Sequence, residues 1–228
     1  MNPQPTLNRT LRVNSKTLFS DKNQYIYMKR IAVLASGRGS NFQSVIEKVK
    51  DGSINGKIVC LITDKPDAYA IERAEKAGIP VKIIDFNKFK TRDDYNNELR
   101  RTMTEVNPDV FVLAGYMRLL DTETAKAFKG RMINIHPALL PSFKGLHAQR
   151  QAVEYGVKVA GCTVHFVDEE MDGGAIILQH VVPVLDDDDE DTLADRILEE
   201  EHIALPKALA LFCDDKLVLE GRRVRILK

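Results

Sequence analysis

Short apolar runs alternate with amphipathic segments over the first two thirds of the chain. Five of these runs are rich in β-branched residues, and they lie at 31–35, 57–63, 81–84, 110–114 and 132–135. Runs of this length and composition are typical of buried strands. Their alternation with amphipathic segments predicts successive βα units on a mostly parallel sheet.

The segments between the runs have helical spacing. The first contains apolar residues at i, i+3, i+4 and i+7, namely Phe42, Val45, Ile46 and Val49. Asn41 is placed to cap this helix. A second helix is predicted over 67–77 and a third from near Thr91 to Asn107, each followed within three residues by a proline that stops it.

After residue 135 the rhythm changes. Two longer alternating runs, 161–167 and 175–184, flank an acidic, glycine-rich turn, which favours an antiparallel pair. The acidic stretch 186–191 precedes a helical pattern over 193–212, and we interpret it as a solvated helix cap rather than an interaction patch. The prediction is an α/β fold: a Rossmann-like, mostly parallel sheet with helices on both faces and antiparallel C-terminal strands.

The predicted organisation is one domain over 29–228, preceded by an N-terminal extension at 1–28 outside the core. The extension is polar and basic, and it lacks the apolar stretch of a secretory signal. A start-site artefact and an organellar transit segment remain open as its origin. Oligomeric state also stays open between monomer and homodimer.

Charge and cysteine content limit the classes of partner. Lysine plus arginine balance aspartate plus glutamate at 33 each, so no net field attracts nucleic acid or anionic lipid. No apolar run approaches the roughly 20 residues that cross a bilayer. Three cysteines without short spacing favour neither a thiolate metal site nor a disulfide framework. We expect a cytoplasmic protein with no metal and with neither nucleic-acid nor membrane partners.

A glycine-rich loop follows the first strand and opens the first helix: Ser36-Gly37-Arg38-Gly39-Ser40-Asn41. Backbone N–H groups and the helix dipole bind phosphate at such a position. A dinucleotide motif would need a third glycine, and Phe42 and Gln43 follow instead, although Asp64 after the second strand leaves that alternative open. A glycine turn that serves packing alone is the other alternative.

Asn134 and His136 lie at the end of the fifth run, the edge where open α/β sheets bind ligands. Strand alternation places both side chains on one face. An amide there can donate to a developing oxyanion, and an imidazole can move protons near neutral pH. A structural histidine before Pro137 is the alternative.

Asp172 lies in the turn between the two later runs, next to Gly173 and Gly174. A carboxylate beside His136 would orient the imidazole and stabilise its cation, so these two residues make chemical sense together. An ordinary turn aspartate is the alternative.

Three motifs together resemble the formyltetrahydrofolate-dependent formyltransferases. They are Gly37-x-Gly39-Ser40-Asn41, Asn134-x-His136-Pro137-x-Leu139-Leu140-Pro141 and Asp172-Gly173-Gly174. The resemblance extends from residue 29 to about 212, and it is strongest to the members that formylate glycinamide ribonucleotide in purine biosynthesis. It implies an enzyme that transfers the formyl group of 10-formyltetrahydrofolate to the substrate's amine. The loop residues Ser142, Phe143 and Lys144 depart from close relatives.

The resemblance also implies roles for particular residues. Asn134, His136 and Asp172 would form a catalytic trio. Gly39, Ser40 and Asn41 would hold the substrate phosphate, and Glu201 would meet the substrate amine. The co-substrate would contact Asn134 and a further group of residues, namely Arg92, Met117, Arg118, Leu119 and Leu120.

Other functions are disfavoured by what the chain lacks. Methionyl-tRNA formyltransferases carry an added C-terminal domain, and formyltetrahydrofolate deformylases generally carry an N-terminal one; neither fits 228 residues. A phosphosugar-binding module would have no use for a paired Asn134 and His136. An NAD-dependent dehydrogenase remains the weaker third hypothesis, and the remaining histidines, among them His165, are expected to be surface or strand residues.

Overall fold

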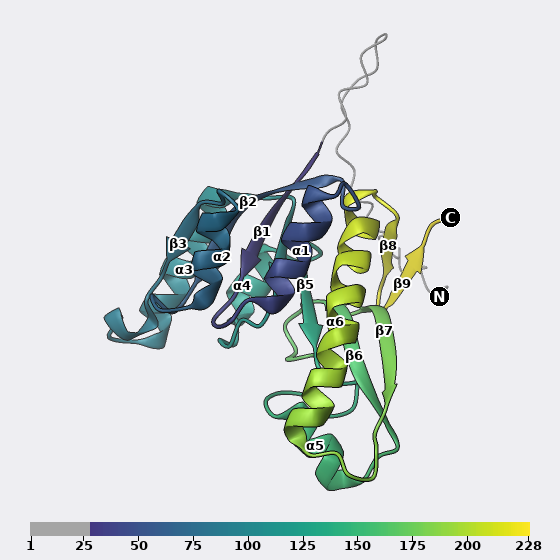
Figure 1. Ribbon diagram of the computed structural model, residues 1–228. Coiled ribbons are helices and arrows are strands. Elements are labelled where there is room, and N and C mark those ends of the chain that lie inside the picture. The colour runs from purple at the N-terminus through teal and green to yellow at the C-terminus, as the bar shows by residue number, and fades with distance from the viewer. Residues whose placement is uncertain (1–27) are drawn as a thin grey trace, which may run out of the picture.

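The computed structural model describes residues 28–228, so most of the predicted extension at 1–28 lies outside the described residues. Figure 1 shows the arrangement of the elements. The strands are β1 (Lys29–Leu34), β2 (Gly56–Thr63), β3 (Val81–Ile83), β4 (Val110–Leu113), β5 (Met132–His136), β6 (Val159–Phe166), β7 (Ile176–Pro183), β8 (Leu217–Glu220) and β9 (Arg223–Ile226). The helices are α1 (Ser40–Lys50), α2 (Tyr69–Lys76), the 3-10 helix η1 (Phe86–Lys88), α3 (Arg92–Val106), α4 (Thr122–Ala127), α5 (Ala148–Tyr155) and α6 (Glu190–Cys213).

All strands of the described residues belong to one sheet with the order β3-β2-β1-β4-β5-β6-β7-β9-β8. The first five of these run parallel, β6 is antiparallel to β5, and β7 is antiparallel to β6. The prediction of a mostly parallel sheet with antiparallel C-terminal strands is therefore confirmed. The central parallel strands β1, β4 and β5 are almost entirely buried, which is why they read as continuous apolar runs, whereas the edge strand β3 is largely exposed.

Helices cover both faces of the sheet, as predicted. One core contains side chains from α1, α2, α5 and α6 packed on alternate strand residues, such as Val33 and Val112. The other core contains α3 and α4 packed on the residues between them, such as Leu34 and Phe111. In Figure 1, α1 and the long helix α6 lie next to each other on the first face.

Some local features differ from the sequence pattern. Asn41 lies inside α1, and Gly39 is the N-cap, so the prediction of an Asn41 cap is wrong. Asp189 caps α6 with a capping box, which confirms the predicted role of the acidic stretch. Five short elements, η1, α4, α5, β8 and β9, were not predicted. Each is eight residues or shorter, too short to show a clear period.

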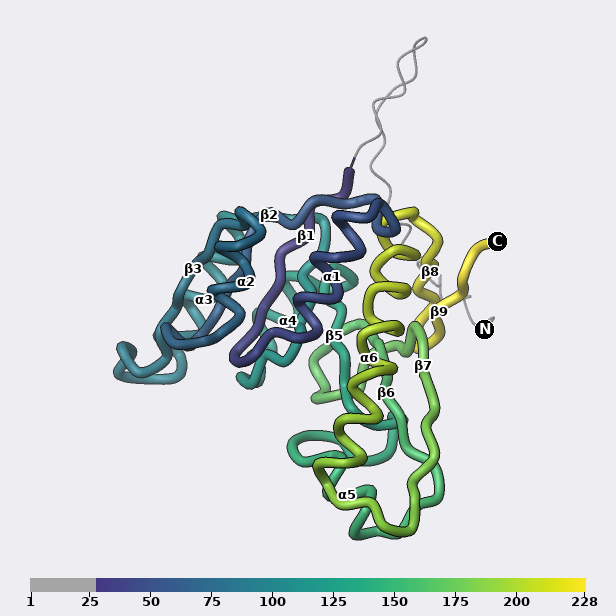
Figure 2. The backbone as a smooth tube through the Cα atoms, viewed as in Figure 1, coloured from purple at the N-terminus to yellow at the C-terminus, as the bar shows by residue number. Residues whose placement is uncertain are grey.

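The parallel strands end at one edge, and this edge organises the rest of the molecule. The chain leaves β1 through a tight turn into α1, which Figure 2 traces as the purple bend below the labels of these two elements. The segments after β4 and β5 leave the sheet at the same edge, because both strands run parallel to β1. Within residues 28–228, no helix combines the length and apolar character needed to span a membrane.

Candidate active site

Asn134 and His136 occupy alternate positions on β5. Their neighbours Ile133 and Ile135 belong to the core on the α1 and α6 face, so the two polar side chains point to the other face of the strand. The His136 residue is only 5% exposed. Its Nε2 donates a hydrogen bond to the Phe143 carbonyl at 2.9 Å, which orients the ring. The predicted common face of the amide and the imidazole is confirmed.

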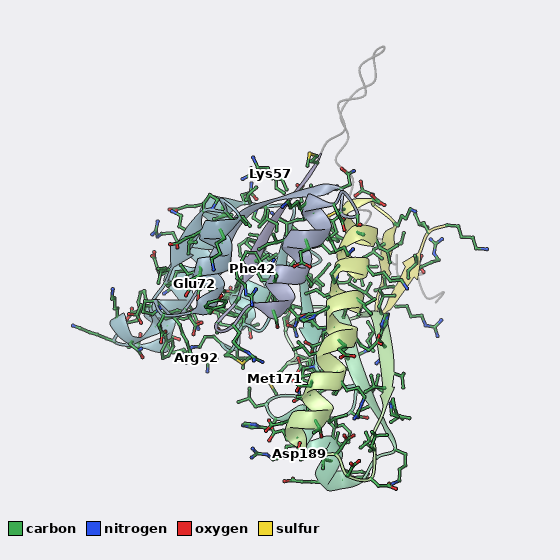
Figure 3. The ribbon with its side chains drawn as sticks, viewed as in Figure 1. Phe42, Lys57, Glu72, Arg92, Met171 and Asp189 are labelled. Carbon is green, nitrogen blue, oxygen red and sulfur yellow. The ribbon has the colours of Figure 1, made fainter. Side chains whose placement is uncertain are left out.

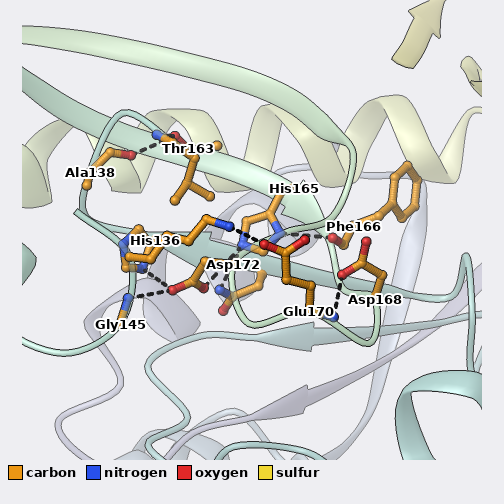
Figure 4. Close-up of polar contacts among 12 residues, drawn as sticks. His136, Ala138, Gly145, Thr163, His165, Phe166, Asp168, Glu170 and Asp172 are labelled. Atoms are coloured by element: carbon orange, nitrogen blue, oxygen red, sulfur yellow. Dashed lines mark hydrogen bonds and ion pairs between the residues drawn. The ribbon is translucent and has the colours of Figure 1, made fainter. Parts of the chain in front are cut away.

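Asp172 lies against His136, as Figure 4 shows. Its Oδ2 is 3.5 Å from His136 Nδ1, longer than an ordinary hydrogen bond, and accepts a hydrogen bond from Gly145 N at 2.8 Å. The Asp172 backbone is left-handed, with φ of 50°, a conformation that aspartate tolerates better than most residues. The turn before Gly173 and Gly174 therefore aims the carboxylate at the imidazole.

His165 on β6 joins the amide to the carboxylate. Asn134 Nδ2 is 3.1 Å from His165 Nε2, which lies 3.8 Å from Asp172 Oδ1. His165 Nδ1 donates to the Phe166 carbonyl at 2.9 Å, so in a neutral ring Nε2 is free to accept from the amide. Burial lowers the pKa of His165, which agrees with this neutral form. One Asn134 N–H is used here, and within residues 28–228 the amide nitrogen donates no other hydrogen bond.

The loop after His136 is held by polar side chains from β6 and β7. Thr163 Oγ1 donates to the Ala138 carbonyl at 2.6 Å and accepts from Leu140 N at 3.0 Å. Gln179 Nε2 donates to the Leu140 carbonyl at 2.9 Å. These bonds fix the segment whose Phe143 carbonyl holds the imidazole, so the site is preorganised.

The glycine loop turns sharply into the first turn of α1. Gly39 has φ of 67° and precedes the first turn of α1, where Ser40 is the first residue. A Cβ at Gly39 would lie 2.9 Å from the Ala70 Cβ, so glycine is required both for conformation and for close approach to α2. The backbone N–H groups of this turn are the ones that bind anions at helix N-termini.

Glu201 on α6 lies beside this loop. Its Oε2 accepts a hydrogen bond from Asn41 Nδ2 at 2.6 Å, and both residues are 7% exposed. Burial raises the pKa of Glu201 to about 7, and the Asn41 hydrogen bond partly offsets this. Asn41 Oδ1 is buried without a hydrogen-bond partner. Glu201 thus contacts Asn41 at the end of the glycine loop. Within residues 28–228, no hydrogen bond or ion pair joins Glu201 to His136 or Asp172.

The residues assigned to the co-substrate form a second group at the same edge. Arg92, labelled in Figure 3, begins α3, and its Nη2 donates to the Leu119 carbonyl at 3.1 Å. The segment 117–120 follows β4, with Met117 61% exposed and Leu119 52% exposed. Leu120 packs against the second core, and Arg118 donates from Nε to Asp64 Oδ2 at 2.7 Å.

Ser36 connects the glycine loop to the segment after β4. Its backbone N–H donates to the Gly115 carbonyl at 3.0 Å, and its hydroxyl accepts from Met117 N at 2.8 Å. The glycine loop and the segment after β4 are therefore one linked surface. A cavity of about 480 Å³ lies nearby, but its lining includes Phe143, Tyr155 and Ala160 and none of Asn134, His136 or Asp172.

The contact of His165 with Asn134 and its position near Asp172 were not predicted, because His165 was expected to be an ordinary strand or surface residue. The available signal was the polar pair Thr163 and His165, two residues apart inside an otherwise apolar run. Both point to one face, and the register pairs Asn134 with His165 and His136 with Thr163. That register is set by tertiary pairing and is not visible in the run itself.

Comparisons with known proteins agree with this architecture. A family model described as formyl transferase matches residues 29–209. Phosphoribosylglycinamide formyltransferase of Escherichia coli (strain K12) is 42% identical over 187 residues, covering 82% of this chain and 88% of that protein. The crystal structure of glycinamide ribonucleotide transformylase 1 from Symbiobacterium toebii superposes with a TM-score of 0.87 at 47% identity, over 92% of this chain and all of the other.

Two further relatives show the range of the similarity. The trifunctional purine biosynthetic protein adenosine-3 of Drosophila melanogaster is 48% identical over 185 residues; the match covers 80% of this chain but only 14% of that protein. A formyltetrahydrofolate deformylase from Pseudomonas syringae pv. tomato str. DC3000 has a TM-score of 0.82 at 27% identity, over 88% of this chain and 66% of that chain. With the fold, the site and these matches in agreement, the chain belongs to the formyl transferase family.

Proposed function

We propose that this protein transfers the formyl group of 10-formyltetrahydrofolate to the amine of glycinamide ribonucleotide, a step of de novo purine biosynthesis. The observation that carries the proposal is the convergence of Asn134, His136 and Asp172 at the sheet edge that also bears the Gly39 turn. The E. coli and S. toebii relatives carry names for this activity and match most of the chain.

The reaction exchanges one C–N bond for another. The substrate amine attacks the formyl carbon, and negative charge develops on the formyl oxygen. The bond from that carbon to folate N10 then breaks, and one proton moves from the attacking amine to N10. Products are formylglycinamide ribonucleotide and tetrahydrofolate, with no net uptake of water, metal or electrons.

Asn134 supplies a donor for the developing oxyanion. His165 holds one of its amide N–H groups, which orients the other for the formyl oxygen. We assign the proton transfer to His136, whose Nδ1 lies beside Asp172, a carboxylate that would stabilise positive charge on the ring. Removal of these groups should slow the chemical step more than substrate binding.

The glycine loop and the segment after β4 divide the two substrates between them. Gly39, Ser40 and Asn41 hold the phosphate at the N-terminus of α1. Glu201, paired with Asn41, is assigned to the same substrate, and its position beside the loop is compatible with its proposed contact to the substrate amine. Arg92 and segment 117–120 take the reduced folate, together with Asn134.

The remaining features of the proposal are simple. The partners are the two small-molecule substrates, with neither nucleic acid nor membrane involved, in a cytoplasmic enzyme that uses no metal. A deformylase is the second candidate, because one solved relative carries that name. It would release formate from 10-formyltetrahydrofolate without an amine acceptor.

A spectrophotometric assay of folate product with and without glycinamide ribonucleotide separates these functions. We expect product only when the ribonucleotide is present. His136→Ala should lower kcat by about a hundredfold or more, because proton transfer by a positioned side chain contributes that much. Thermal unfolding of the variant serves as the control for folding. Near-normal turnover in a folded variant would remove His136 from the chemistry, and product without the ribonucleotide would favour the deformylase.

A further inference from the structure

Asp64 is a buried carboxylate that the proposed mechanism does not use. It follows β2 and is 1% exposed. Its Oδ2 accepts from Arg118 Nε at 2.7 Å, and its Oδ1 is buried without a hydrogen-bond partner. A buried carboxylate with one unsatisfied oxygen is costly, and the Arg118 guanidinium is the cation that compensates it.

Arg118 is held on a second side by an aromatic ring. Its guanidinium carbon lies 3.9 Å from the centroid of the Phe86 ring, within the range of a cation–π contact. The Nε–H is used by Asp64, and within residues 28–228 neither Nη group makes a protein hydrogen bond. The planar group is thus fixed in place while its Nη donors stay available to a ligand.

The backbone around Arg118 is fixed at two neighbouring points. Met117 N donates to Ser36 Oγ, and the Leu119 carbonyl accepts from Arg92. The Asp64 contact is the third anchor of this segment and the only one of the three made by the Arg118 side chain. Met117 and Leu119 are otherwise exposed, so few packing contacts hold them.

We propose that Asp64 is a positioning residue for the reduced-folate subsite. It clamps Arg118 against Phe86 and so keeps segment 117–120 in the shape that binds the folate, without touching the ligand itself. This inference rests on the proposed function in one respect, since it takes a reduced folate as the ligand of that segment.

The test compares Asp64→Asn with the wild-type protein. Asparagine keeps the shape of the side chain but replaces the charge-assisted hydrogen bond to Arg118 with a neutral one. The lost interaction energy corresponds to about fivefold weaker folate binding. We expect the KM for 10-formyltetrahydrofolate and the Kd for tetrahydrofolate, measured by calorimetry, to rise by about that factor. The kcat and the KM for glycinamide ribonucleotide should stay within about twofold, because the other substrate and the chemistry are untouched.

A double-mutant cycle shows whether Asp64 acts through Arg118. Arg118→Ala should weaken tetrahydrofolate binding and also lower the melting temperature, because it leaves a buried carboxylate unpaired. Adding Asp64→Asn to Arg118→Ala should raise the melting temperature again without further loss of tetrahydrofolate binding. If Asp64→Asn weakened tetrahydrofolate binding by the same factor in the wild-type protein and in Arg118→Ala, the proposal would be overturned.

Two more variants test whether a folding defect or a general loss of charge could explain weaker tetrahydrofolate binding in Asp64→Asn. Phe86→Leu removes the stacking ring and leaves every charge in place, so it should also weaken tetrahydrofolate binding, by a smaller factor. Glu98→Gln removes a carboxylate from an exposed ion pair with Arg101 on α3 and should leave tetrahydrofolate binding unchanged. Wild-type affinity in both Asp64→Asn and Phe86→Leu would show that Asp64 is only structural.

Calorimetry keeps this test apart from the proposed function. Tetrahydrofolate binding that responds to Asp64 supports the positioning role even when no formyl transfer to glycinamide ribonucleotide is measured. Formyl transfer with unchanged folate KM and Kd in Asp64→Asn would support the proposed function and contradict the positioning role of Asp64. Absence of any tetrahydrofolate binding by the wild-type protein would overturn both.

Discussion

At the scale of single residues, the site depends on polar groups removed from water. His136, His165 and Glu201 are each less than a tenth exposed. Each is matched to a partner: His136 to Asp172, His165 to Asn134, and Glu201 to Asn41. Burial makes such pairs sensitive to charge, because the ionised form has lost its hydration. Protonation of Glu201 should therefore affect the stability of the whole fold.

Glu201→Gln should change how stability depends on pH. The pKa of Glu201 rises from 4.5 in the unfolded chain to about 7 in the folded protein. As pH rises from 4.5 to 7, the unfolded state loses this proton first, so the wild-type protein loses stability over that range and no more above it. The shift corresponds to about 3 kcal/mol, and the glutamine variant should not show this loss.

Urea unfolding of both proteins at pH 5 and pH 8 measures the effect. Other groups titrate equally in the two proteins, so the difference between their pH slopes isolates Glu201. Parallel slopes would mean that Glu201 is ionised throughout this range in the folded protein.

At the scale of elements, the turn from β1 into α1 combines two demands on one residue. Gly39 must adopt a left-handed backbone conformation at the start of α1. It must also lack a Cβ, because it packs closely against Ala70 on α2. Gly37, two residues earlier, has open space around its Cα and no left-handed φ. The two glycines of the motif are therefore not equivalent, although the sequence shows them as a pair.

Gly39→Ala should damage both stability and substrate binding. A left-handed alanine costs about 1 kcal/mol or more, and the contact with Ala70 adds to this. The turn must shift, so the KM for glycinamide ribonucleotide should rise more than the KM for the folate. Gly37→Ala, its matched control, should alter melting temperature and both KM values much less. Similar KM values in the two variants would contradict a phosphate-binding role for the Gly39 turn.

At the scale of the whole molecule, the sheet, which has nine strands within residues 28–228, brings the two groups of proposed substrate-binding residues to one edge. The family match spans residues 29–209 of this chain. The C-terminal strands β8 and β9 extend the sheet beyond it, and β9 pairs with β7. The catalytic unit that we propose therefore begins near residue 29.

Removal of residues 1–27 should leave the enzyme active. We expect kcat, both KM values and the melting temperature of the shortened chain to match those of the full chain, because the described site contacts lie within residues 28–228. A loss of more than about threefold in kcat/KM, equivalent to roughly 0.7 kcal/mol, would assign the extension a part in catalysis.

The sequence alone determined the local features of this protein. Apolar runs with strand and helix periods predicted the α/β layers, since burial of those runs is a local requirement. Gly39, Asn134 and His136 could be recognised as candidates because each stands at the end of a predicted strand, the edge where such sheets bind ligands. Asp172 was found by the same local means, as a carboxylate beside two glycines.

Only the tertiary structure decided which distant groups meet. Asn41 and Glu201 are 160 residues apart in sequence yet share a hydrogen bond, and Asp64 reaches Arg118 across 54 residues. His165 enters the site because β6 pairs antiparallel with β5 in one register, and a shift by one residue would turn it to the other face. Such contacts follow from strand order and packing, which depend on the whole chain at once and leave no periodic trace in any one segment.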